Sequence, residues 1–470
     1  MHTKKIALLG FDREGRSTFR LLREDPAFRD AELWILDRDE NVALPPGAHA
    51  RLGEGYLAAL DELGPGDIVF RTPGARAHLP ELVRARARGV EVTSATRLFF
   101  ARCPGTIIGV TGTKGKGTTS SLIHAMLKAD GRKALLAGNI GVPALDILPE
   151  VDASTWVVLE LSSFQLVDLD RSPHIGVALM VTSEHLDWHE TVEDYAEAKS
   201  HIVRAQGPDD IAVLAADYPR SAAYADLTPG TIFLFSRHHA VARGAWAEEG
   251  AFWFSAGAPS GENHDAHPRA IPMIGPKERI CATAALRIPG EHNWENACAA
   301  IAAAKAAGVA TAAIVEAIQN FQGLAHRLEF VAEAGGVRYY NDSYSTTPDA
   351  AIVALEAFAA PKVLILGGSS KGSDFTELGR AIDAAAEKGG IRAIIGIGME
   401  WPRIKEHIHA AGIAFLEDLH SMEEIVRAAH GTARRGDVVI LSPACASFDM
   451  FKNYSDRGDQ FRNEAHRLRD

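Results

Sequence analysis

The sequence has few cysteines and no long hydrophobic run. Its four cysteines, Cys103, Cys281, Cys298 and Cys445, are widely spaced, and none belongs to a Cys-x-x-Cys pair. This spacing indicates reduced, mostly buried thiols rather than disulfides or zinc ligands. No apolar run approaches the ~18 residues of a membrane helix, and the run before Gly10 is too short for a signal peptide. We therefore expect a cytoplasmic protein that does not bind a membrane.

An excess of basic residues is missing as well. The formal net charge is -12 and the isoelectric point is about 5.9. A protein that binds nucleic acids or anionic membranes needs a basic surface, so we expect no nucleic-acid partner. A local basic pocket for a charged substrate is still compatible with this net charge. The 470 residues are 47% hydrophobic and 23% charged, which is typical of a globular chain with roughly three domains. We expect a monomer.

Strand-length apolar runs alternate with helix-length amphipathic segments along the whole chain. This alternation predicts an α/β fold with parallel sheets covered by helices. The runs fall into three groups, which are KIALLG, ELWILD and DIVFRTPG, then TIIGV, STWVVLEL and IGVALMVT, then VRYYND, PKVLILGG, IRAIIGIG and DVVILSPA. We predict a Rossmann-like domain over 1–103, a central P-loop ATPase-like domain over 104–322 and a Rossmann-like domain over 323–470. Residues 237–290 have the composition of hairpins and loops.

The most informative segment is IGVTGTKGKGTTSSLI, residues 108–123. A β-branched run leads into a glycine-rich loop, and a helical pattern follows it. Backbone N–H groups of such a loop and the helix N-terminus attract phosphate, and Lys116 is suited to neutralise the outer phosphates. Gly117 stands where a Ser or Thr usually binds Mg²⁺, so Thr118 or Thr119 must supply that hydroxyl. The alternative is a glycine-rich structural turn.

Two further segments bring ligand-type side chains to strand ends. Glu160 ends an apolar strand, where its carboxylate is suited to Mg²⁺, although a strand-end Glu in isolation is more often a surface or capping acid. His185, Asp187 and His189 follow another apolar run. Zinc is one interpretation of this cluster, but Mg²⁺ and substrate contacts are favoured because no Cys is near. Lys199 lies on an amphipathic helix, where a lysine is ordinarily solvated.

The last predicted domain repeats this pattern. Arg327 offers a forked contact for phosphate, and Asp342 ends a strand with an acid suited to a ribose or adenine. Lys371 lies in the strand-following loop GGSSKGSDF, and small hydroxyl residues precede a helix in residues 442–461. Each of these signals is weak when taken alone.

Together these motifs resemble the Mur ligase family, the ATP-dependent enzymes that add amino acids to the peptidoglycan precursor. The matching segments are GVTGTKGKGTT, GNIGVPAL, LELSSFQL, EHLDWH with YAEAKSHI, GEHNWENACAA, FQGLAHRLEFV, YYNDS, GGSSKGSDF and LSPACASFDMFKNYSDRGDQF. They follow the family's order over residues 109–461, and the first domain matches more loosely. The resemblance is strongest to the branch that adds glutamate to UDP-N-acetylmuramoyl-L-alanine.

The resemblance implies three domains and a reaction through an acyl phosphate. ATP phosphorylates the terminal carboxylate of the bound alanine, the amino group of glutamate attacks, and phosphate leaves. Positive groups and Mg²⁺, two ions in the family, stabilise the developing charge. The implied substrates are UDP-N-acetylmuramoyl-L-alanine and glutamate, with D-glutamate as the default.

Position by position, the resemblance also implies roles for single residues. The residues implied to bind the ATP phosphates are Gly112, Thr113, Lys114, Gly115, Lys116, Gly117 and Thr118. Those implied to bind the rest of the nucleotide are Asn293, Asn296, Arg327 and Asp342. The Mg²⁺ ligands are Thr118, Glu160, His185 and Lys199, the last as a carbamylated lysine. Lys116, His185 and Lys199 are the implied catalytic residues. Asn139 and Gln165 are implied to contact the sugar nucleotide. Its uridine diphosphate is implied to contact Gly10, Gly15, Asp37, Thr72, Pro73 and Gly74. Lys371, Ser447 and Tyr454 surround the incoming amino acid.

Three positions depart from the family pattern. Asp12 replaces the usual second glycine of the first-domain loop, and Gly117 gives the phosphate loop a likeness to folylpolyglutamate synthetases. Tyr344 occupies a position where the glutamate-adding enzymes usually carry lysine, which makes a variant that adds L-glutamate before an epimerase the main alternative. A folylpolyglutamate synthetase and a non-catalytic protein that binds a sugar nucleotide are weaker alternatives.

Overall fold

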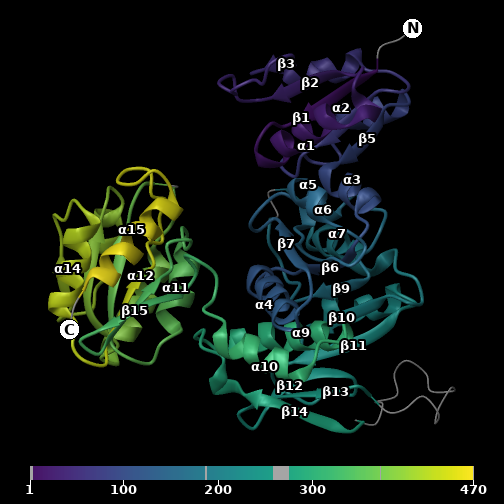
Figure 1. The fold of residues 1–470 in the computed structure, drawn as a ribbon. Helices are drawn as coiled ribbons and strands as arrows, with labels where there is room; N and C mark the ends of the chain where they lie inside the picture. The colour runs from purple at the N-terminus through teal and green to yellow at the C-terminus, as the bar shows by residue number, and fades with distance from the viewer. Residues whose placement is uncertain (1–3, 186–187, 258–274, 371, 469–470) are drawn as a thin grey trace. The chain divides into compact units, whose positions relative to one another are not determined.

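The computed structural model describes residues 4–185, 188–257, 275–370 and 372–468. They form two compact units (Figure 1), one comprising Met1–Ala285 with Trp294–Gln319 and the other Leu286–Asn293 with Asn320–Asp470. The first predicted domain and most of the second fall in the first unit, whereas residues 286–293 and 320–322 belong to the second. The division into three domains stays a prediction. Among the described residues, no helix is long and apolar enough to cross a membrane.

The first sheet has the strand order β3-β2-β1-β4-β5, and the pairings within it are parallel. The order of the strands reverses between β1 and β4, and a ligand crevice is expected at the carboxyl ends of strands at such a switch point. The elements of this region are β1 Lys5–Leu9, α1 Arg13–Glu24, β2 Glu32–Asp37, β3 His49–Leu52, β4 Ile68–Arg71, α2 Pro80–Ala87, β5 Glu91–Ser94 and α3 Ala95–Arg102.

The second sheet has the order β14-β13-β12-β11-β10-β9-β6-β8-β7. It is parallel from β7 to β12, and β13 and β14 extend it antiparallel within the segment where hairpins were predicted. Its strands are β6 Thr106–Thr111, β7 Ala134–Gly138, β8 Trp156–Glu160, β9 Ile175–Ala178, β10 Ile211–Ala215, β11 Thr231–Ser236, β12 Gly244–Glu248, β13 Ala251–Ser255 and β14 Lys277–Ala282. Its helices are α4 Lys116–Ala129, α5 Ala144–Ile147, α6 Ser163–Leu166, α7 Val192–Arg204, α8 Pro219–Ala222, α9 His292–Ala306 and α10 Thr311–Asn320.

Burial explains why the central strands read as continuous apolar runs. Strand β8 is buried on both faces after its first residue, as expected where helices cover both faces of a parallel sheet. On α4, the side chains of Leu122, Ile123, Met126 and Leu127 are fully buried. Phe99 of α3 belongs to the same hydrophobic cluster as residues of α5 and α6, so α3, which follows the first sheet, packs into the core of the second.

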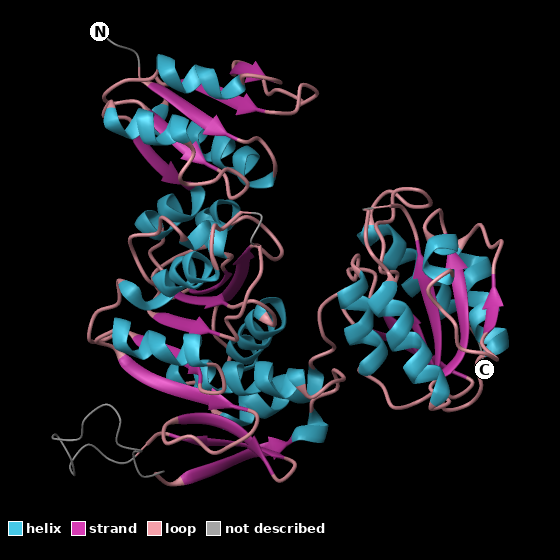
Figure 2. Ribbon diagram, turned by 180° about the vertical axis from the view of Figure 1, so that it is seen from behind, coloured by secondary structure: helices cyan, strands magenta, loops and turns pink. Residues whose placement is uncertain are grey.

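The second unit contains a third sheet, with the order β15-β16-β20-β17-β18-β19. Among the described strand pairings of this sheet, only the edge pair of β15 and β16 is antiparallel. Helices cover both faces of the sheet (Figure 2). The elements are β15 Glu329–Ala334, β16 Val337–Asn341, α11 Pro348–Glu356, β17 Lys362–Gly367, α12 Thr376–Glu387, β18 Ile391–Ile397, α13 Trp401–Lys405, β19 Ala414–Leu416, α14 Met422–Thr432, β20 Val438–Leu441 and α15 Tyr454–Arg467.

Candidate active site

The glycine-rich loop joins the carboxyl end of β6 to the N-terminus of α4. Gly115 caps α4 with a φ of 86°, which is the left-handed region that favours glycine. A Cβ at Gly115 would lie 2.1 Å from Asn296 Oδ1, so α9 packs directly on the loop backbone. The loop therefore has the strand-loop-helix context that a phosphate-binding loop requires.

Bonds to neighbouring strand ends hold the loop in place. The Thr113 N–H donates to Met180 O at 2.7 Å. Thr113 Oγ1 accepts from Thr182 N–H at 3.0 Å and from the Tyr195 hydroxyl at 3.2 Å. Lys116 Nζ donates to the carbonyls of Gly112 and Thr113, each at 3.0 Å. The lysine thus lies folded over the loop whose phosphate it is predicted to neutralise.

The structure separates the two candidate hydroxyls for Mg²⁺. Thr119 is fully buried, and its hydroxyl donates to Asn296 Oδ1 at 3.4 Å. Thr118, in the first turn of α4, is 9% exposed. Because the Thr119 hydroxyl is committed to α9, Thr118 is the better candidate for the position that Gly117 leaves without a hydroxyl.

Glu160 ends β8 at the same edge of the sheet as the loop. It is 6% exposed, and one of its oxygens accepts from Asn139 Nδ2 at 2.8 Å. Asn139 is fixed in turn by its own N–H, which donates to Glu160 O at 3.0 Å. The predicted sugar-nucleotide residue and the predicted metal ligand are therefore direct neighbours.

Lys199 is buried, although its position on an amphipathic helix favours a solvated side chain. It is 1% exposed, and its Nζ donates to Gly112 O at 3.0 Å and to Thr111 Oγ1 at 3.3 Å. Burial, reinforced by the charge of Lys116, lowers the pKa of Lys199 well below its ordinary value, while Glu184 and Glu160 act in the opposite direction. A lowered pKa increases the neutral fraction of this amine, and the neutral form is the nucleophile that carbamylation needs.

His185 stands at the mouth of this region. Its backbone has a φ of 58°, its ring lies 4.8 Å from that of Phe164, and its Nε2 is 3.8 Å from Glu184 Oε2. Glu184 also pairs with Lys114 at 2.6 Å. Asp187 lies outside the described residues, and within those that the structure does describe, no group of three His, Cys, Asp or Glu side chains is arranged around a metal position.

His189 has a structural environment rather than a ligand-like one. It is 4% exposed, its Nε2 lies 2.9 Å from Ser163 Oγ, and its ring stacks on Phe164. His189 is not among the predicted Mg²⁺ ligands, which stay Thr118, Glu160, His185 and Lys199.

The residues predicted for uridine diphosphate lie around the ends of β1, β2 and β4. Gly10 has a φ of 97°, and a Cβ there would lie 2.2 Å from Thr72 Oγ1. A Cβ at Gly15 would meet Gly10 O at 2.3 Å. Asp37 Oδ2 accepts from Phe11 N–H at 2.7 Å. Pro73 and Gly74 follow Thr72 in the same turn, so this predicted set lies at the carboxyl ends of the first sheet's strands, where a ligand crevice is expected.

Gln165 is held by a residue that the sequence motifs did not single out. Its Nε2 donates to Glu14 Oε1 at 2.5 Å, and its Oε1 accepts from Ser162 N–H at 3.0 Å. Burial raises the pKa of Glu14 above its ordinary value, against the Gln165 hydrogen bond and the charge of Arg71, which lower it. Glu14 lies in α1, far from α6 in the sequence, so only the tertiary structure reveals its hydrogen bond with Gln165.

In the second unit, Asp342 is the buried centre of the predicted nucleotide residues. Its oxygens accept from Leu328 N–H at 3.0 Å and from the Ser442 hydroxyl at 2.7 Å. Burial raises the pKa of Asp342 to about 6, although these hydrogen bonds and the charge of Arg327 oppose the shift. Arg327 is exposed and its guanidinium lies 5.3 Å from the centre of the Tyr344 ring.

Asn293 belongs to the second unit and Asn296 to the first, although both are on α9. Asn293 Nδ2 donates to Pro289 O at 2.6 Å. Asn296, as described above, packs on the phosphate loop. The two asparagines therefore have different local surroundings.

The residues predicted for the incoming amino acid are partly described. Lys371 lies outside the described residues. Tyr454, 41% exposed, begins α15 and its ring meets that of Tyr344 edge-on at 5.2 Å. Ser447 is buried in the loop after β20. A fully buried arginine that the motifs did not single out, Arg457, ties these loops together by donating to the carbonyls of Ser343, Cys445 and Ala446.

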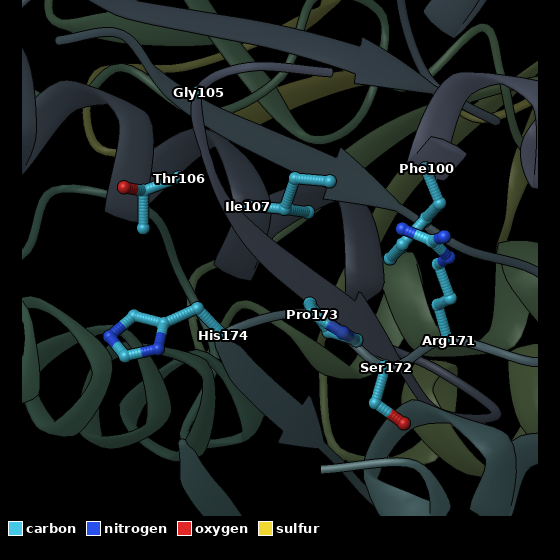
Figure 3. A pocket seen from close by; sticks show the side chains of 8 residues that line it. All are labelled: Phe100, Gly105, Thr106, Ile107, Arg171, Ser172, Pro173 and His174. Carbon is cyan, nitrogen blue, oxygen red and sulfur yellow. The ribbon is translucent and has the colours of Figure 1, made fainter. Parts of the chain in front are cut away.

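A hollow of about 390 Å³ lies at the opposite edge of the second sheet (Figure 3). Thr106 begins β6 and His174 precedes β9, so the hollow is at the amino ends of these strands. No predicted site residue is among those that line it, which are Phe100, Gly105, Thr106, Ile107, Arg171, Ser172, Pro173 and His174. Parallel sheets bind ligands at their carboxyl ends, so this hollow is not the candidate active site.

Comparison with known proteins shows the family to which the chain belongs. Residues 110–304 match the family model of the Mur ligase middle domain, and residues 326–445 match that of the Mur ligase glutamate ligase domain. The MurF ligase of Thermotoga maritima, solved in complex with ADP, is similar in fold with a TM-score of 0.55 and 18% identity, over 99% of this chain and 96% of that one. The chain belongs to the Mur ligase family.

Two relatives within that family are similar over nearly their whole length. The UDP-N-acetylmuramoylalanine–D-glutamate ligase of Pelotomaculum thermopropionicum is 37% identical over 98% of this chain and 96% of its own. The protein of the same name from Geobacillus kaustophilus is 36% identical over 99% of this chain and 98% of its own. The resemblance inferred from the sequence motifs is thereby confirmed at the level of the family.

Proposed function

We propose that this chain joins D-glutamate to UDP-N-acetylmuramoyl-L-alanine at the expense of ATP, as a step of peptidoglycan precursor synthesis in the cytoplasm. The observation that carries the proposal is the gathering of the phosphate loop, Glu160 and the buried amine of Lys199 at one sheet edge. The names of the two full-length relatives support the choice of substrates.

The first chemical step needs ATP and the alanine carboxylate in line. Loop N–H groups and Lys116 would hold the phosphates and balance the charge that develops during transfer. The carboxylate attacks the terminal phosphorus, which gives an acyl phosphate and ADP. The amino group of glutamate then attacks the carbonyl carbon, loses a proton, and inorganic phosphate leaves with the C–O electron pair.

The donor set fits Mg²⁺ bound by hard oxygen ligands. Thr118 and Glu160 would hold one ion beside the phosphates. Carbamylation of Lys199 would convert its amine into a carboxylate for a second ion, with His185 close to that metal and the substrate. The bound Mg²⁺ would polarise the phosphoryl oxygens.

We expect the sugar nucleotide and the glutamate to contact other parts of the chain. The crevice around Gly10, Thr72 and Asp37 would receive the uridine diphosphate, with Asn139 and Gln165 toward the sugar. Arg327 and Asp342 would hold the nucleotide of ATP. Ser447 and Tyr454, with Lys371, would surround the glutamate. We expect the protein to act as a monomer.

Phosphate release from ATP with UDP-N-acetylmuramoyl-L-alanine, compared between D-glutamate and L-glutamate, tests the function. We expect turnover with D-glutamate and at least about 100-fold lower kcat/KM with L-glutamate, since each 1.4 kcal/mol of transition-state discrimination is a factor of ten. Tyr344, half-exposed beside Tyr454, is the feature that favours the opposite result. Turnover with L-glutamate alone would replace the proposal by the L-glutamate-adding variant, and no turnover with either would overturn it.

A further inference from the structure

Arg71 ends β4, and all three nitrogens of its guanidinium donate hydrogen bonds to acceptors within the first unit. The side chain is 1% exposed. Its Nε and Nη2 donate to the two oxygens of Asp168, each at 3.1 Å. Its Nη1 donates to Ala75 O at 2.7 Å and to Thr72 O at 3.2 Å, and its Nη2 also donates to Phe164 O at 2.8 Å.

These partners belong to two segments far apart in the sequence. Thr72 and Ala75 are the two ends of the turn after β4, which the Ala75 N–H closes by donating to Thr72 O at 3.0 Å. That turn is fastened to β1, because the Thr72 N–H and hydroxyl both donate to Leu9 O, at 3.1 and 2.7 Å. The turn therefore forms one wall of the crevice proposed for the uridine diphosphate.

The other segment is α6, a helix of one turn. Phe164 and Gln165 are neighbours in it, and Asp168 follows its C-cap residue, Val167. Arg71 binds the Phe164 carbonyl and the Asp168 carboxylate together, so it fixes the short helix that aims Gln165. The same side chain thus contacts both the turn around Pro73 and the helix of Gln165.

We propose that Arg71 is a positioning residue. It fixes the position of the turn from Thr72 to Ala75, which is proposed to bind the uridine diphosphate, relative to α6, and thereby determines how well the sugar nucleotide fits. The inference rests on the proposed function, because it assumes that this crevice and Gln165 bind one substrate. The planar fork of arginine reaches carbonyls and a carboxylate in several directions at once, whereas a lysine ammonium on a flexible stem cannot reproduce that geometry. Arg71 itself touches no reacting atom.

A merely structural role predicts something different, because removal of one partner from a buried ion pair destabilises a fold whatever the pair positions. The test therefore compares binding and stability in the full chain. The variants are Arg71→Lys, Arg71→Met and Asp168→Asn. Arg84→Met is the control, since Arg84 is half-exposed on α2 and pairs with Asp61 and Glu81 at the surface.

We expect Arg71→Lys to raise KM for UDP-N-acetylmuramoyl-L-alanine at least about tenfold, with KM for ATP within about twofold of wild type. Asp168→Asn changes KM for the same substrate in the same direction but less, and Arg84→Met leaves both constants unchanged. Calorimetric titration with UDP-N-acetylmuramoyl-L-alanine gives the matching loss of affinity without turnover. A lower thermal midpoint of Arg71→Lys with unchanged KM and affinity would overturn the inference, as would an equal rise of both KM values.

Failure of the proposed function has a separate signature. A wild-type protein that binds UDP-N-acetylmuramoyl-L-alanine but does not release phosphate would overturn the proposed reaction, and the titration would still decide the role of Arg71. A wild-type protein that does not bind this substrate would overturn the reaction and the positioning role together. An unfolded Arg71→Met leaves the decision to Arg71→Lys and Asp168→Asn.

Discussion

At the scale of single residues, Asp342 makes the free energy of unfolding depend on pH and, in its proposed role, would do the same for nucleotide binding. Its pKa is raised by burial to about 6, against 3.8 for the ordinary carboxyl, so the folded state takes up this proton first as pH falls. Between pH ~4 and ~6 the folded state binds more protons, and the free energy of unfolding decreases as pH rises. The shift corresponds to at most about 3 kcal/mol of cost for the ionised form at neutral pH.

We expect affinity for ATP to fall below pH about 6, because a protonated Asp342 accepts fewer hydrogen bonds from a ligand. Asp342→Asn should weaken ATP binding about tenfold at pH 7.5, and the affinity of this variant for ATP should no longer fall as the pH drops below about 6. Titration of a fluorescent ATP analogue from pH 5 to pH 8 measures both. The same fall of affinity in Asp342→Asn would assign the pH dependence to another group.

Lys199 presents a buried amine where carbamylation needs a neutral nucleophile. Lys199→Ala should lower kcat at least about 100-fold, since it would remove the carboxylate proposed for the second Mg²⁺. A short-chain carboxylate in the assay should restore part of the activity, whereas bicarbonate should not, because the variant has no amine to carbamylate. Lys128→Ala, at an exposed site of α4, is the control. Undiminished activity of Lys199→Ala would remove this lysine from the mechanism.

At the scale of elements, the phosphate loop depends on a glycine for two separable reasons. Gly115 and Gly131, at the two ends of α4, have similar φ angles of 86° and 74°. A Cβ at Gly115 would collide with Asn296, whereas nothing lies within 4 Å of a Cβ at Gly131. Both alanine variants bear the left-handed strain of about 1–2 kcal/mol, but only Gly115→Ala displaces the loop.

We therefore expect Gly131→Ala to lower the free energy of unfolding by about 1 kcal/mol with kcat/KM for ATP unchanged. Gly115→Ala should lower kcat/KM for ATP at least about 100-fold in addition to its loss of stability. Denaturant unfolding and steady-state kinetics measure the two effects. Equal kinetic behaviour of the two variants would mean that the close approach of Asn296 does not shape the ATP site.

Local patterns predicted the elements better than the partners of single side chains. The apolar runs KIALLG, TIIGV and VRYYND correspond to β1, β6 and β16, because a strand buried on both faces needs nothing beyond local apolarity. Burial of Lys199 did not follow from its helical position, and only the family resemblance singled it out. Arg71 meets Asp168 across 97 residues of sequence, and Glu14 meets Gln165 across 151. No periodicity records such pairs.

At the scale of the whole molecule, the residues predicted for ATP are divided between the two units. Lys116 and Asn296 belong to the first unit, and Arg327 and Asp342 to the second. A ligand that binds the native state stabilises it by mass action, by about 2.7 kcal/mol at a hundredfold excess over Kd. Under the proposed roles, we expect this gain in those segments of each unit that carry these residues.

Hydrogen exchange followed by mass spectrometry measures that distribution directly. A non-hydrolysable ATP analogue should slow exchange in peptides that cover residues 106–120 of the first unit and in peptides that cover 326–345 of the second. Asp342→Asn should reduce the protection of residues 326–345, because it replaces the carboxylate that is proposed to contact the nucleotide there. Protection confined to residues 106–120, unchanged by Asp342→Asn, would show that the second unit takes no part in holding the nucleotide and would remove Arg327 and Asp342 from the proposed site.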